Sequence, residues 1–120
     1  MSIKTTAAEL YDALKTVEGL RVYRDLAGPG AAVQPPAAVL SAPAFVWEGG
    51  CDGPTEARWL VYLVAAADER ALEWLWEHLP EVAAALDSVP SAAVQRADPG
   101  AYQASPAELP CYEIQVDVGL

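Results

Sequence analysis

Residues 58–86 read RWLVYLVAAADERALEWLWEHLPEVAAAL, and this stretch decides the fold of the chain. Its first half predicts a β-strand, because apolar side chains would alternate onto both faces. One face would carry Trp59, Val61 and Leu63, and the other would carry Leu60, Tyr62 and Val64. A strand that is apolar on both faces is typical of the centre of a sheet, so we expect a central strand here.

The second half of the stretch predicts a long amphipathic helix. Leucine and valine recur at the helical period, and three glutamates fall on the opposite side. Asp68 is placed to cap the first turn, and Pro80 predicts a kink or the start of a short second helix. The expected apolar face consists of Leu72, Leu75, Leu79, Val82 and Leu86, and the expected solvent face of Glu73, Glu77 and Glu81.

Shorter elements flank this stretch on both sides. Thr6 with Glu9 forms a capping pattern that predicts a first helix over residues 7–18. The turn at 49–54, GGCDGP, predicts a hairpin between a strand ending at Glu48 and the central strand. The other predicted strands are 20–24, 37–40, 44–48, 94–97 and 112–118, and the predicted long loops are 25–36 and 98–110.

These elements together predict an α+β fold in one domain over residues 1–120. We expect a four- to six-stranded, mostly antiparallel sheet with two helices packed on one face. The second face of the central strand has no helix assigned to it, so either a loop or a neighbouring subunit must cover it.

The composition limits the classes of partner. Seventeen acidic and seven basic residues give a formal net charge of −10, and the basic residues are scattered, which argues against a nucleic-acid-binding surface. The longest uncharged apolar run, from Trp59 to Ala67, is too short to cross a bilayer, so we expect no membrane partner. Cys51 and Cys111 are isolated from each other and are expected to be reduced thiols.

No arrangement of residues predicts catalysis, so we expect neither an enzyme nor a bound cofactor or metal. His78 is the only histidine, and it would lie one helical turn from Trp74 as a surface or interface residue. The glycine-rich stretches match no phosphate-binding motif and are interpreted as turns. The glutamates of the long helix are interpreted as a solvated face rather than as a metal site.

The tryptophans predict an interaction surface. Trp59 and Trp76 are expected in the core, whereas Trp74 would project away from the apolar face and Trp47 would lie on a short edge strand. Exposed tryptophans are common in protein interfaces, although they also cover loops of their own subunit. The candidate subunit or partner interface residues are Trp47, Arg58, Leu60, Tyr62, Trp74, His78 and Tyr102.

Several segments resemble the tail terminator proteins of long-tailed bacteriophages, especially those that infect actinobacteria. The similar segments are LYDALKTVEGLRVYR near the N-terminus, a Pro-Pro pair before AAVLSAP, the VWEGG turn, the 59–86 stretch, and the closing ADPGAYQ and CYEIQVDV. The resemblance covers nearly the whole chain, and it rests on the order and spacing of elements rather than on a catalytic signature.

The resemblance implies a homo-hexameric ring that caps the tail tube in the neck of the virion, after assembly in the host cytoplasm. Its partners would be other copies of the chain, the tail tube protein and the head–tail connector or head completion protein. DNA would pass through the ring without specific binding, and acidic groups along the channel would repel its phosphates. Two alternatives stay open: another phage neck or adaptor protein of similar fold, and a small bacterial ligand-binding or enzymatic α/β domain with its site at the acidic helix or Cys51.

Overall fold

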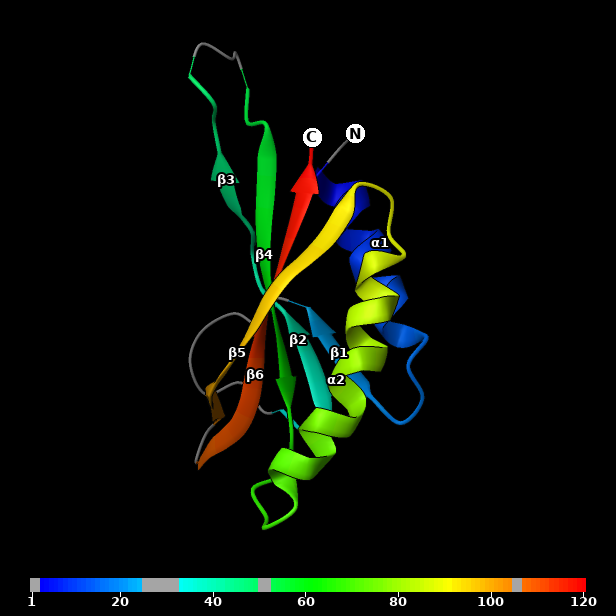
Figure 1. The fold of residues 1–120 in the computed structure, drawn as a ribbon, viewed down its shortest axis with the longest axis vertical. Helices are drawn as coiled ribbons and strands as arrows, with labels where there is room; N and C mark the ends of the chain where they lie inside the picture. The colour runs from blue at the N-terminus through cyan, green and yellow to red at the C-terminus, as the bar shows by residue number, and fades with distance from the viewer. Residues whose placement is uncertain (1–2, 25–32, 50–52, 105–106) are drawn as a thin grey trace.

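The computed structural model describes residues 3–24, 33–49, 53–104 and 107–120. Within these residues the chain forms two helices and a six-stranded sheet, and both helices lie on the same side of the sheet (Figure 1). The predicted α+β class is confirmed. The elements in chain order are α1 (Ile3–Lys15), β1 (Arg21–Arg24), β2 (Ala37–Leu40), β3 (Ala44–Val46), β4 (Glu56–Val64), α2 (Ala71–Asp87), β5 (Ala92–Ala104) and β6 (Ala107–Gly119).

β4 is the central strand, as its two apolar faces predict. The sheet order is β1-β2-β4-β6-β5, with β3 also paired to β4, and only the β1–β2 pair is parallel. The face of β4 that carries Trp59, Val61 and Leu63 packs under the helices together with alternate residues of β6. The fully buried side chains contributed by the other elements include Leu10, Leu14, Leu75, Val82, Leu86, Ile114, Val116 and Val118.

The first helix begins earlier than the capping pattern predicts. Thr6 is fully buried inside α1 instead of capping it, so the predicted start at residue 7 is wrong. Thr6, Leu10 and Leu14 are spaced by four residues, and all three face the sheet. The helix ends at Lys15, and the chain turns through Gly19, whose φ of 76° favours glycine.

The second helix differs from the prediction at its start and at Pro80. The α2 helix begins at Ala71, and Asp68 accepts a hydrogen bond from the Arg70 backbone N–H (2.8 Å) in the turn before it, so Asp68 is not the cap. The helix runs through Pro80 without a break. Pro80 and Trp76 are both exposed, so water can satisfy the Trp76 carbonyl that loses its helical donor.

The predicted loop at 98–110 is wrong, because its described residues, 98–104 and 107–110, belong to two long paired strands. β5 and β6 pair from Ala92–Val118 to Ala104–Ala107, with one register shift between Val94 and Arg96. The short strand predicted at 94–97 is therefore part of a 13-residue strand. Prolines and a glycine hid this strand from the sequence pattern.

Pro99 fits in β5 because its backbone nitrogen, which carries no hydrogen, points away from the neighbouring strand. The Ala65 N–H donates to the Pro110 carbonyl (3.0 Å), so Pro110 and Tyr112 direct their backbone groups toward β4. Tyr112 is the register partner of Pro99, whose nitrogen therefore points to the free edge. Pro110 itself lies where β4 ends, beyond the last pair of the β4–β6 ladder, Val64 with Cys111.

The predicted hairpin before the central strand is confirmed by the pairing of β3 with β4, from Ala44–Arg58 to Val46–Glu56. The strand is shorter than the predicted 44–48. Residues 50–52 of the predicted turn lie outside the described residues, and so do residues 25–32 of the predicted loop at 25–36. The hairpin and the first turn of α2 lie at opposite ends of the molecule, whose longest dimension is 49 Å (Figure 1).

Candidate functional site

An aromatic pair lies on β3 and the residues that follow it in the β3–β4 hairpin. The rings of Phe45 and Trp47 meet edge to face with centroids 6.3 Å apart, and Trp47 is 57% exposed. We call Phe45 and Trp47 the hairpin surface. The predicted exposure of Trp47 is confirmed, whereas Phe45 was not among the candidate residues. Two adjacent exposed rings are unusual on the surface of a soluble domain and are typical of a contact surface.

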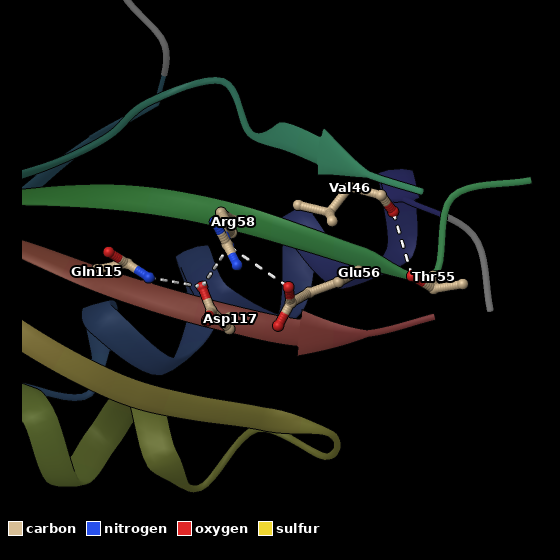
Figure 2. A network of polar contacts seen from close by, with 6 residues as sticks. All are labelled: Val46, Thr55, Glu56, Arg58, Gln115 and Asp117. Atoms are coloured by element: carbon tan, nitrogen blue, oxygen red, sulfur yellow. Dashed lines mark hydrogen bonds and ion pairs between the residues drawn. The ribbon is translucent and has the colours of Figure 1, made fainter. Parts of the chain in front are cut away.

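A polar network holds the base of this hairpin to the neighbouring strand (Figure 2). The Arg58 Nε lies 3.4 Å from a Glu56 carboxylate oxygen and 3.7 Å from an Asp117 oxygen, which also accepts from Gln115 (3.1 Å). The Thr55 N–H donates to the Val46 carbonyl at 2.8 Å. Because Arg58 is half exposed, these ion pairs position strands more than they stabilise the fold.

The rest of the uncovered sheet face is divided into an exposed part and a covered part. Leu60 is 38% exposed next to the polar network. Farther along β4, Tyr62 packs against Tyr102 of β5, with ring centroids 5.3 Å apart. Burial, followed by the Glu113 carboxylate, raises the pKa of Tyr62. The covered part is a second apolar cluster, made of Val33, Ala37 and Val39 with Tyr23, Tyr62, Tyr102 and Leu109.

The tryptophans of α2 are placed opposite to the prediction. Trp74 packs against the core and is half-buried, and His78 stacks on it with ring centroids 4.3 Å apart. Trp76 is 57% exposed, and its Nε1–H donates to the Tyr112 hydroxyl (2.8 Å). The helix is rotated so that Ala71, rather than Leu72, faces the sheet. Trp76 and the 50% exposed Leu72 lie one turn apart and form what we call the helix surface.

A hollow of about 250 Å³ lies beside Trp74, where the end of β4 meets the start of α2 and the residue before β2. Its lining is mostly apolar. Asp68, the acidic group of this lining, accepts the Arg70 backbone N–H. The hollow is lined by Pro36, Ala65, Ala66, Asp68, Arg70, Ala71 and Trp74.

The structure therefore distributes the candidate residues over three places. Trp47 lies on the hairpin, four residues lie on the uncovered sheet face, and Trp74 and His78 stack together on α2. Sequence reasoning missed the helix surface and the hollow. The helix surface depends on the rotation of α2, and the hollow is built from segments far apart in the sequence. The four residues of the sheet face are Arg58, Leu60, Tyr62 and Tyr102.

The potential chemistry of the cysteines and carboxylates is limited in the described part of the chain. Burial, followed by the Glu113 carboxylate, raises the pKa of the Cys111 thiol to about 11, so this thiol is protonated near neutral pH. Cys51 lies outside the described residues. Glu73, Glu77 and Glu81 are exposed. Among the described residues no three His, Cys, Asp or Glu side chains are grouped to hold a metal ion.

Neither helix of the described chain has the length and apolar character needed to span a bilayer. No known protein-family model matches the sequence, and no curated protein matches it significantly.

Proposed function

We propose that this chain is a structural subunit that forms a ring on the end of a bacteriophage tail tube and joins the tube to the head–tail connector. The observation that carries the proposal is the hairpin surface, an exposed pair of aromatic rings at one end of an elongated molecule. Both rings are exposed, so their apolar area is available for a protein contact.

The base of the hairpin supports the same interpretation. β3 pairs only with β4 among the described strands, and the ion pairs of Arg58 link β4 to Asp117 of β6. The paired part of the hairpin is therefore anchored to the main sheet before any partner binds. Preorganisation of this kind reduces the entropy that a contact must offset.

The helix surface supplies a second, separate apolar area. Leu72 and Trp76 lie on α2, and the Trp76 indole is oriented by its hydrogen bond to Tyr112. A subunit of a closed ring needs two different surfaces for its neighbours and further area for the structures above and below the ring. In the proposed role the hairpin surface contacts another copy, and the helix surface contacts the tube or the connector, without catalysis.

The proposal is tested by measuring the mass of the purified protein by light scattering over a range of concentrations, with and without assembled tail tubes. A six-subunit species, or a monomer that forms rings only on tube ends, is expected. The double variant Leu72→Ala, Trp76→Ala should lose tube binding, whereas the control Glu73→Gln on the same helix should retain it. A protein that stays monomeric and ignores tube ends at every concentration would refute the proposed function.

A further inference from the structure

We infer that Trp47 of one copy inserts into the hollow beside Trp74 of a second copy, which makes a head-to-tail contact between identical chains. This inference deepens the proposed function and rests on it for its role, because it names the contact through which a ring would close. The observations behind it are the size and chemistry of the hollow, the position of the hairpin, and the charges beside each.

The hollow has the size of an aromatic side chain. A cavity of roughly 150 Å³ accommodates benzene, so a hollow of about 250 Å³ is large enough for the two fused rings of an indole. Its walls are alanine, proline and the Trp74 ring, which offer apolar contact. The Asp68 carboxylate already accepts the Arg70 backbone N–H. An apolar side chain therefore suits the hollow better than a small polar ligand, which would need several directed polar groups.

A chain cannot fill its own hollow with its own hairpin. Trp47 follows β3, near the end of the molecule where the hairpin lies, whereas the hollow lies at the first turn of α2, near the opposite end (Figure 1). The longest dimension of the molecule is 49 Å. A contact between the two is therefore intermolecular and joins unlike surfaces. Such a contact closes into a ring if the rotation between copies allows it, and otherwise forms a filament.

The charges next to the two surfaces include one pair of opposite sign, although Asp68 also borders the hollow. Glu48 follows Trp47 and is exposed, and Arg70 borders the hollow and is also exposed. Within the described part of the chain neither side chain forms an ion pair, whereas Arg58 and Arg96 do. Insertion of Trp47 would bring the Glu48 carboxylate toward the Arg70 guanidinium of the second copy. This pairing would orient the contact and oppose insertion of the ring in other directions.

The contact is tested with a pair of variants that each disable one side of it. Trp47→Ala removes the inserted ring, and Ala66→Trp fills the hollow from an exposed position. Each variant alone should weaken self-association by about 30-fold or more, as expected for a central aromatic contact. An equimolar mixture should form a 1:1 dimer that does not grow further, because only one working contact remains between the two variants. Sedimentation velocity measures both effects.

The control is Glu81→Gln, which changes an exposed residue of α2 outside both surfaces and should leave self-association unchanged. Charge reversal gives an independent check. Glu48→Arg and Arg70→Glu should each weaken association, and the chain that carries both should recover it. Circular dichroism verifies that every variant is folded.

The possible outcomes separate this inference from the proposed function. Wild-type rings that persist in Trp47→Ala overturn the contact and leave the tube-capping role standing. Self-association that follows the predicted pattern in a protein indifferent to tube ends supports the contact and refutes the role. A wild-type protein that stays monomeric at every concentration, on tubes and in solution, refutes both.

Discussion

Replacing Leu75 by alanine, with Leu72→Ala as its matched comparison, tests the rotation of α2 directly. Leu75 is fully buried and Leu72 is 50% exposed, although both belong to the apolar face predicted from the sequence. Truncation of a buried leucine removes its transfer free energy and leaves a cavity, so Leu75→Ala should lower the free energy of unfolding by about 3 kcal/mol. Leu72 loses only half of a burial worth about 1.5–3 kcal/mol and leaves no cavity, so about 1 kcal/mol is expected.

Urea unfolding followed by circular dichroism measures both values, at concentrations low enough to keep the wild-type protein monomeric. With a denaturant slope of about 1.5 kcal/mol/M, the unfolding midpoint should fall by about 2 M for Leu75→Ala and by about 0.7 M for Leu72→Ala. The two variants share the same chemical change in the same helix, so differences in helix propensity cancel.

Equal losses for the two variants would refute the reasoning. They would mean that Leu72 and Leu75 face the sheet to the same extent, as the sequence pattern alone predicts. The exposure of Trp76 and the half-burial of Trp74 depend on the same rotation. The helix surface and the hollow beside Trp74 would then both have to be abandoned as surfaces for partners.

Three further outcomes follow from contacts described above. Trp76→Phe and Tyr112→Phe should each lower the free energy of unfolding by about 1 kcal/mol. The double variant should lose less than the sum of the two, because both single variants lose the same hydrogen bond, and additive losses in urea titrations would contradict that bond. Burial raises the pKa of Cys111 from 9.0 to about 11, so the thiol of the unfolded chain loses its proton at lower pH than the thiol of the folded chain. The free energy of unfolding should therefore fall as pH rises from about 9 through 11, more steeply in wild type than in Cys111→Ala. Identical pH profiles of the urea midpoint in the two proteins would contradict this prediction. Arg58→Ala should change the free energy of unfolding by less than about 1 kcal/mol, and by still less in high salt, because the Arg58 side chain in its ion pairs is half exposed. A larger loss in thermal or urea unfolding would show that the network stabilises the fold.

The central strand could be predicted from the sequence because its signal is local. Trp59, Val61 and Leu63 alternate with Leu60 and Tyr62 in one unbroken run, and no proline or glycine interrupts it. Apolar side chains on both faces are typical of a strand inside a sheet, and β4 has hydrogen-bonded strands along both of its edges.

The rotation of α2 could not be predicted, because apolar side chains occupy more of the helix than the sheet can cover. Leu72, Trp76 and Leu79 extend the apolar arc to one side, whereas Ala71 adds little to any hydrophobicity pattern. Contact with β5 and β6 selects the side centred on Leu75. Ala71 is buried at the first turn, and Trp76 lies outside.

The β5–β6 hairpin could not be predicted, because its signals depend on neighbours in space. Pro99 is tolerated only because its nitrogen faces the free edge, and Pro110 only because β4 has already ended. Neither condition is visible along the chain. The hollow is hidden for a similar reason, since Pro36 and Trp74 are far apart in the sequence and meet only in the folded chain. Trp47, by contrast, is exposed as predicted, because a three-residue edge strand cannot bury it.

The edge of β5 has a consequence for solubility. A free strand of 13 residues would otherwise offer a long row of backbone groups on which other chains could add strands and aggregate. Pro99 removes one of the outward donors, and the register shift at Val94–Arg96 bends the strand away from a flat template. The Arg96–Asp98 ion pair places charged groups on the strand between the register shift and Pro99. These features oppose the addition of strands from other chains at this edge and favour contacts through side chains rather than through backbone.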